Sequence, residues 1–175
     1  IPDAEISRLN AMPGDTTMTL SPRFSRVLDA ALSIGDMTGG AYDITVRPLV
    51  ELWGFGASTR EPTPPSDAEI AEAMAQTGAE RLSWNATSAS LTRPAGMSID
   101  LSSIAKGYAV DELAALLGSQ GIVNSLVEIG GELRASGARP EGGLWRLAVE
   151  SPDPSQSRFI EAIAVSDAAV ATSGD

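Results

Sequence analysis

Short strand patterns occur in neighbouring pairs along this chain, and three longer helical patterns interrupt them. The strand patterns are rich in apolar or β-branched residues and are bounded by glycine, proline, asparagine or serine. The predicted strands are residues 82–85 and 90–93, which form a hairpin, a strand that ends at Asp100, and residues 124–129, 132–135, 145–150 and 158–165. Paired strands broken by helices, rather than a strict alternation of strand and helix, predict an α+β domain with a mixed or antiparallel sheet and about three helices.

Each of the three helical patterns carries recognisable start and stop signals. The first, residues 21–40, begins with a serine N-cap and a proline at the first helical position, and two glycines end it. The second, residues 66–78, begins with a capping box, in which a serine and a glutamate three residues later satisfy each other's backbone N–H groups, and a glycine ends it. The third is expected to have its N-cap at Ser102 or Ser103 and to run to Gly118.

The composition narrows the possible functions. The 175 residues, 43% of them hydrophobic, suit one domain with an apolar core. The formal net charge of −11 and the lack of any basic run exclude a nucleic-acid-binding surface. Cysteine and histidine are absent, so thiolate catalysis is excluded and any metal site must use oxygen ligands, which suit Mg²⁺ or Ca²⁺. Because the overall charge repels anions, an anionic ligand must be held locally by a metal ion, a helix end or a few placed cations.

The only lysine of the chain, Lys106, marks the densest group of reactive side chains. Asp100, Ser102 and Ser103 precede it, at a predicted junction between a strand and a helix. Helix N-termini favour anions, and a lysine ammonium is a compact charge for phosphate. An ordinary exposed helix lysine is the alternative. For Asp100 two roles also stay open, stabilisation of the helix N-terminus or acceptance of hydrogen bonds from a ligand amine.

Three common nucleotide and acyl-transfer motifs do not fit this region. Residues 103–106 match S-x-x-K of the serine β-lactamases, but the second lysine element of those enzymes is absent. Lys106 lacks the upstream glycine of a phosphate-binding loop, and no G-x-G-x-x-G follows a predicted strand. Serine acyl transfer, a P-loop and a Rossmann dinucleotide site are therefore unsupported.

Two glycine-containing stretches each allow two interpretations. Residues 38–56 concentrate Tyr42, Trp53 and Phe55, which can hold a flat ring or can be core residues of a strand that follows a helix end. Residues 128–132 predict a hairpin turn, with a ligand passing over bare backbone as the alternative.

The chain resembles the ApbE family of FAD:protein FMN transferases in four stretches that occur in the same order. They are residues 40–56 (GAYDITVRPLVELWGFG), 99–111 (IDLSSIAKGYAVD), 121–134 (GIVNSLVEIGGELR) and 169–175 (AVATSGD), and residues 7–10 (SRLN) are also similar. The resemblance implies a single ApbE-like domain over residues 1–175, with parts of the family domain missing at both ends.

The resemblance also implies an activity. Such an enzyme uses Mg²⁺ to split the pyrophosphate of FAD, attaches FMN to a threonine or serine hydroxyl of an acceptor flavoprotein, and releases AMP. An FAD-binding carrier or an FAD pyrophosphatase on the same scaffold is the alternative. The family implies a periplasmic location, possible anchoring to the inner membrane through segments not present here, and no nucleic-acid partner.

Residue roles follow from the same resemblance. The family's functional histidine and its further Mg²⁺ ligands are expected beyond residue 175, so no catalytic residue is assigned within this chain. The residues implied to bind FAD are Ala41, Tyr42, Asp43, Asp100 and Lys106, and the residue implied to bind the metal is Ser103.

Overall fold

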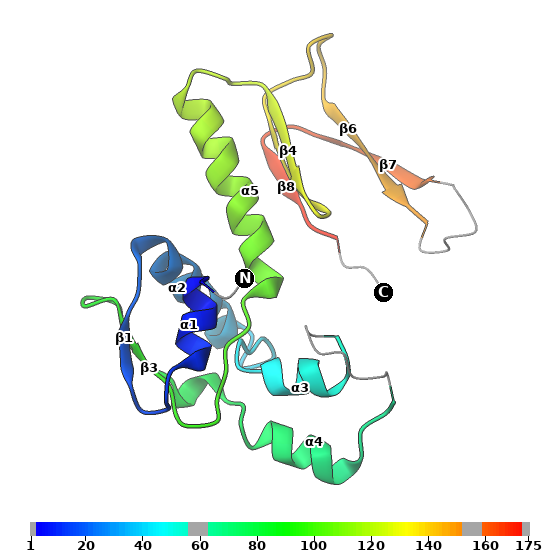
Figure 1. Cartoon of the computed structure of the whole chain (residues 1–175). Coiled ribbons are helices and arrows are strands. Elements are labelled where there is room, and N and C mark those ends of the chain that lie inside the picture. The colour runs from blue at the N-terminus through cyan, green and yellow to red at the C-terminus, as the bar shows by residue number, and fades with distance from the viewer. Residues whose placement is uncertain (1–2, 56–62, 152–158, 173–175) are drawn as a thin grey trace. The chain divides into compact units, whose positions relative to one another are not determined.

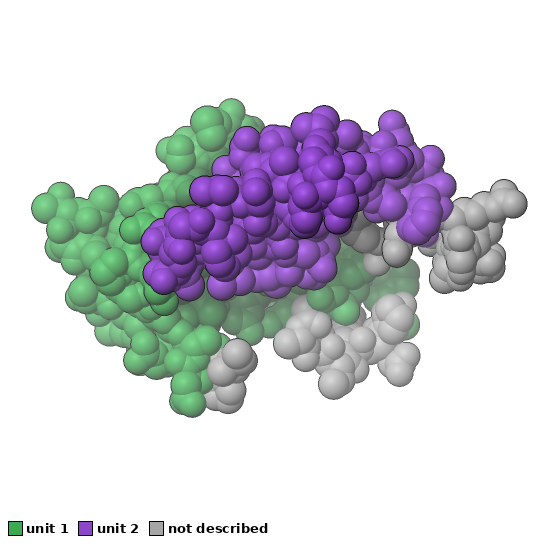
Figure 2. Space-filling model, turned by 90° about the horizontal axis from the view of Figure 1, so that it is seen from above, with its two compact units in different colours: residues 1–103 green, residues 104–175 purple. Residues whose placement is uncertain are grey.

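The computed structural model describes residues 3–55, 63–151 and 159–172, and Figure 1 shows how their helices and strands follow one another. The chain forms two compact units, residues 1–103 (unit 1) and residues 104–175 (unit 2), which Figure 2 shows in green and purple. Small parts of the predicted features lie outside the described residues: residue 56 of the aromatic stretch, the first residue of the last predicted strand, and residues 173–175.

Unit 1 contains helices whose start signals were predicted from the sequence. In α2 (Pro22–Met37) the Ser21 hydroxyl accepts the backbone N–H of Phe24 at 3.3 Å, and Pro22 is the first helical residue, as expected. The capping box of α4 (Asp67–Met74) is also confirmed, between Ser66 and Glu69. The helix ends at Met74, before residue 78, because the chain continues in a tighter turn, in which the N–H groups of Gln76 and Thr77 donate to the carbonyls three residues before them (3.1 and 3.0 Å).

The sheet of unit 1 has three short antiparallel strands in the order β1-β3-β2, namely β1 (Thr17–Thr19), β3 (Ser90–Thr92) and β2 (Ser83–Asn85). Trp84 and Met18 are the register partners of Leu91, which is fully buried. The predicted hairpin of residues 82–85 and 90–93 is thus confirmed, and β1 was not predicted.

Two predictions for unit 1 are wrong. Residues 97–101 form a loop rather than a strand, because the N–H of Asp100 donates to the Ile44 carbonyl (2.7 Å) and the backbone of Ile99 pairs with the side-chain amide of Asn10. These partners satisfy the backbone without a neighbouring strand. Of the two interpretations of residues 38–56, the one that places a strand after the helix end is wrong, because α3 (Arg47–Leu52) lies there, with a proline in its first turn.

A buried arginine joins the first helix, α1 (Glu5–Ala11), to the loop before Asp100. Arg93 is 4% exposed, and its guanidinium donates to the backbone carbonyls of Leu9 (3.1 and 3.2 Å), Asn10 (2.9 Å), Met12 and Met97 (2.6 Å). The last carbonyls of a helix lack partners within the helix and carry partial negative charge, so a cation there is favourable. Arg93 therefore closes the C-terminal end of α1 and fixes the loop against it.

Unit 2 holds most of α5 (Ser102–Ser119) and the strands of two small antiparallel sheets. One sheet has the order β4-β5-β8 and the other pairs β6 with β7; the strands are β4 (Ser125–Ile129), β5 (Glu132–Ser136), β6 (Trp145–Glu150), β7 (Phe159–Val165) and β8 (Ala168–Val170). The strands predicted in this half of the chain are confirmed over the described residues, as is the α+β class. No helix of the described residues is long and apolar enough to cross a membrane.

The turn between β4 and β5 is a hairpin turn, as predicted. Gly130 and Gly131 adopt φ of 56° and 94°. Side chains form hydrogen bonds with backbone groups of both glycines. The Gly131 N–H donates to the Glu128 carboxylate (3.0 Å), and the Thr172 hydroxyl donates to the Gly131 carbonyl (3.2 Å).

Gly131→Ala is expected to lower the free energy of unfolding by about 1–3 kcal/mol, because an L side chain is strained at this φ. A methyl group there would also lie 2.7 Å from the Thr172 hydroxyl oxygen. The matched control is Gly118→Ala, at a helical position with no atom within 4 Å, which is expected to stabilise the protein by about 0.5–1 kcal/mol. Chemical denaturation of both variants checks the pair; equal stabilities for the two would contradict the turn geometry.

Candidate functional site

A cavity of about 330 Å³ lies within unit 1. Its size is at the lower end of small-molecule sites, which run from roughly 300 to 1,000 Å³. It lies where the loop between α2 and α3, one side of α3 and the start of α5 meet, and its lining residues are Ala41, Tyr42, Asp43, Val46, Val50, Asp100, Ser102 and Ser103. The structure thus brings together five of the six residues that the family resemblance implies.

Tyr42 forms an aromatic part of the cavity wall. Its hydroxyl lies 2.9 Å from the Ser103 hydroxyl, and its backbone N–H donates to the side chain of Thr38 at 3.1 Å. Of the three aromatic residues in this stretch, Tyr42 lines the cavity, whereas Trp53 and Phe55 are 44% and 80% exposed. The interpretation of these aromatics as core residues of a strand is therefore wrong.

Asp43 is held by a network of hydrogen bonds from its own loop and from the Gly78 turn. Its Oδ1 accepts the backbone N–H (2.7 Å) and the hydroxyl (2.6 Å) of Thr45, and its Oδ2 accepts the N–H of Ala79 (3.2 Å). The Thr45 hydroxyl in turn accepts the N–H of Gly78 at 2.7 Å. Asp43 therefore has a structural role in addition to its place in the cavity wall.

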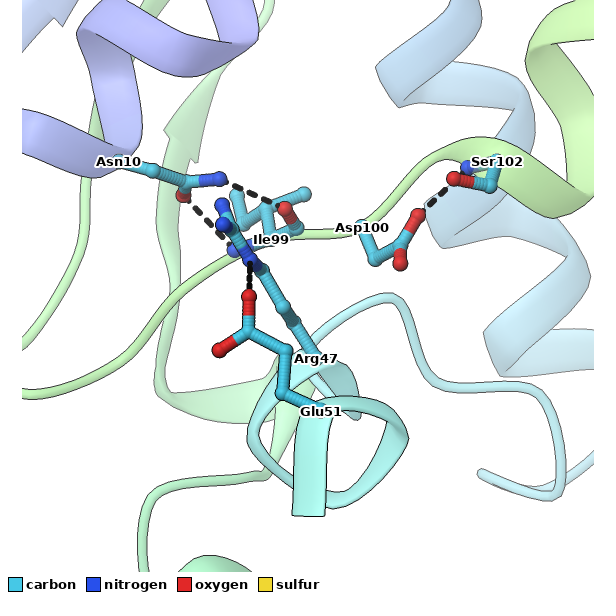
Figure 3. A network of polar contacts seen from close by, with 6 residues as sticks. All are labelled: Asn10, Arg47, Glu51, Ile99, Asp100 and Ser102. Atoms are coloured by element: carbon cyan, nitrogen blue, oxygen red, sulfur yellow. Dashed lines mark hydrogen bonds and ion pairs between the residues drawn. The ribbon is translucent and has the colours of Figure 1, made fainter. Parts of the chain in front are cut away.

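Asp100 performs one of the two roles that the sequence left open. Its Oδ1 accepts the backbone N–H of Ser102 at 2.7 Å, as Figure 3 shows, and so stabilises the first turn of α5. Since α5 begins at Ser102, neither Ser102 nor Ser103 is the N-cap residue, and that prediction is wrong. The other role, a contact with a ligand amine, stays a prediction.

The described residues alone do not make a magnesium site. Ser103 offers one hydroxyl oxygen, and that oxygen lies within hydrogen-bond distance of Tyr42. In the part of the chain that the structure describes, no group of three or more acidic, histidine or cysteine side chains is arranged to hold a metal ion. Protein-bound Mg²⁺ normally has at least one carboxylate ligand, so Ser103 contributes at most part of such a site.

Lys106 belongs to unit 2, where its ammonium group contacts two residues of the β4–β5 hairpin, Gly130 and Glu132. The Nζ atom donates to the Gly130 carbonyl at 2.9 Å and lies 2.7 Å from Oε2 of Glu132. The lysine side chain is 48% exposed and that of Glu132 is 16% exposed. Lys106 is thus an exposed lysine with defined partners rather than a freely solvated one.

Two partners of the predicted site residues were not themselves predicted: Thr45, which contacts Asp43, and Glu132, which contacts Lys106. Asp43 and Thr45 have the spacing of a turn in which an aspartate accepts the N–H two residues on, so the sequence carried a usable local signal. No local signal exists for Glu132, because its contact with Lys106 depends on the β4–β5 hairpin.

The fold and the cavity define an α+β protein with a partly apolar cavity of small-molecule size. The chain belongs to the ApbE family, whose model matches residues 1–175. It is similar to the FAD:protein FMN transferases of Vibrio cholerae (42% identical over 173 residues, 99% of this chain and 52% of the relative) and Haemophilus influenzae (38% over 178 residues, 99% and 51%). The chain therefore spans about half the length of the curated relatives it matches.

Solved structures agree with this membership. The flavin transferase ApbE from Vibrio cholerae matches with a TM-score of 0.89 and 41% identity, covering 100% of this chain and 56% of that one. The ApbE protein from Thermotoga maritima matches with a TM-score of 0.88 and 31% identity, covering 98% and 55%. The family predicted from the four sequence stretches is thus confirmed.

Proposed function

We propose that this protein acts as an FAD:protein FMN transferase, which binds FAD and moves FMN to a threonine or serine hydroxyl of an acceptor flavoprotein, with release of AMP. The observation that carries the proposal is the convergence of Ala41, Tyr42, Asp43, Asp100 and Ser103 on one cavity. The names of the similar proteins support it as well. A periplasmic location belongs to the proposal and rests on the family resemblance.

The cavity has the chemical character that part of a flavin dinucleotide needs. Ala41, Val46, Val50 and the Tyr42 ring supply apolar surface against which a flat ring can pack. The carboxylate of Asp100 has an oxygen, Oδ2, besides the one that accepts the Ser102 N–H, and it can accept a hydrogen bond from a ligand N–H or O–H group.

Charge is the second requirement, because phosphoryl transfer depends on positioning and on neutralisation of the phosphate oxygens. Lys106 would supply one ammonium to the phosphates of FAD. Dependence on Mg²⁺ is part of the proposal through Ser103 as one oxygen ligand, and since the described residues do not complete that site, no reaction step is derived through the metal.

The experiment incubates the protein with FAD, Mg²⁺ and an acceptor flavoprotein, followed by denaturing electrophoresis and chromatography of the small molecules. The expected result is flavin fluorescence that stays with the denatured acceptor, together with an equal amount of AMP. The control is an acceptor in which valine replaces the flavin-bearing threonine. Its denatured band should show no flavin fluorescence. Release of free FMN would instead show a pyrophosphatase, and recovery of intact FAD bound to the native protein would show a carrier; either result alone would overturn the proposal.

A further inference from the structure

Thr45 is a polar residue with no exposed surface, placed directly behind a residue of the cavity wall. Its hydroxyl makes two hydrogen bonds: it donates to Oδ1 of Asp43 at 2.6 Å and accepts the N–H of Gly78 at 2.7 Å. Leaving either group without its partner in a buried place is unfavourable. The threonine side chain itself does not line the cavity, so any influence on a ligand must pass through Asp43.

The hydrogen bonds of Asp43 limit what its carboxylate can do. An ionised carboxylate has about four acceptor positions, two on each oxygen. Thr45 occupies both positions of Oδ1 through its N–H and its hydroxyl, and the Ala79 N–H occupies one position of Oδ2. One acceptor position, on Oδ2, is left for a ligand.

We propose that Thr45 is a positioning residue of the flavin site, which orients Asp43 so that it accepts one N–H or O–H donor of FAD. The inference rests on the proposed function. A carboxylate with one open acceptor position matches a donor on the ring, the sugar or the sugar alcohol of FAD, whereas the pyrophosphate has no donor and carries the same sign of charge. Without the Thr45 hydroxyl, the terminal torsion of Asp43, which has a broad preference of its own, loses one of its restraints.

The first test compares Thr45→Val with Thr45→Ser. Valine removes the hydroxyl and keeps the branched shape, while serine keeps the hydroxyl. The FAD dissociation constant, measured by quenching of flavin fluorescence well below the melting temperature, is expected to rise about tenfold for valine and to stay within about twofold for serine. A threonine that only stabilises the fold would lower the melting temperature of the valine variant and leave the affinity for FAD unchanged, which would overturn the inference.

A double-mutant cycle tests whether the effect passes through Asp43. In the Asp43→Ala background, Thr45→Val is expected to change FAD affinity by less than about twofold, because the group that it orients is gone. A full tenfold loss in that background would contradict the role of Thr45. Wild-type protein that binds no FAD would instead overturn the proposed function, and the inference with it.

Asp43→Asn is a milder variant that tests the chemistry of the ligand group if the valine variant folds poorly. The amide keeps one oxygen for Thr45, but at the other position a donor replaces the oxygen that accepts the Ala79 N–H and the ligand group. FAD affinity is expected to fall about tenfold or more if Asp43 receives an N–H or O–H group. A gain in affinity would show that Asp43 faces the pyrophosphate and would overturn the inference.

Discussion

Arg93→Ala is expected to lower the free energy of unfolding by about 3–5 kcal/mol, a large part of the stability of a typical domain. The side chain is 4% exposed, and its truncation removes the guanidinium donors from the backbone carbonyls of Asn10, Met12 and Met97. Each such group costs about 1–3 kcal/mol, and the space left by the guanidinium adds a packing loss. Removal of a buried charge offsets part of this cost.

Urea denaturation followed by circular dichroism and tryptophan fluorescence measures the effect. Arg8→Ala is the matched control, because Arg8 lies on the same helix and is exposed; its expected effect is below about 0.5 kcal/mol. Arg93→Lys keeps the charge but lacks the planar fork that reaches several carbonyls, so it should be destabilising as well. A loss of less than about 1 kcal/mol for Arg93→Ala would show that water replaces the guanidinium.

Lys106→Ala is expected to weaken FAD binding about 10- to 100-fold, which corresponds to a charge-assisted hydrogen bond of about 1–3 kcal/mol. An ammonium has three N–H donors. One of them donates to the Gly130 carbonyl at 2.9 Å, and the ammonium forms an ion pair with the Glu132 carboxylate at 2.7 Å, so its donors are not all used within the β4–β5 hairpin. Because Lys106 is 48% exposed, its ion pair should add little to stability.

Titration of the variant with FAD and with riboflavin separates a phosphate contact from a general disturbance. Riboflavin has no phosphate, so its affinity should be unchanged. Arg134→Ala removes another half-exposed cation of unit 2, one that lies 3.7 Å from Asp111, and should leave the affinity for FAD within about twofold of the wild type. Unchanged FAD binding by Lys106→Ala would remove Lys106 from the flavin site.

Local chemistry explains which elements were predictable. The caps at Ser21 and Ser66 act within four residues of the chain, so the sequence pattern contains the whole interaction. The expected strand before Asp100 failed because its backbone partners, Ile44 and the Asn10 side chain, are more than fifty residues away in the chain. A run of apolar residues predicts burial in such a segment, but not whether a strand or a loop satisfies its N–H and C=O groups.

The difference between local contacts and contacts of distant segments also explains which residues of the candidate site were predicted. Family resemblance pointed to Asp43 and Asp100, which lie in recognisable stretches and line the cavity. It did not point to Arg93 or Glu132, whose contacts join segments far apart in the chain, and it did not point to Thr45 although the Asp43–Thr45 contact is local. Contacts between distant segments become visible only when the fold is known.

Asp100 lines the cavity, and its carboxylate also accepts a hydrogen bond from the first turn of α5. The stability of that turn and the shape of the cavity wall therefore depend on the same side chain. When that turn frays, the carboxylate loses the Ser102 amide that orients it, and part of the cavity wall is lost at the same moment. Occupancy of the cavity and integrity of the helix end are therefore reciprocally linked. A ligand that binds the cavity more tightly when this turn is intact also stabilises the turn against opening.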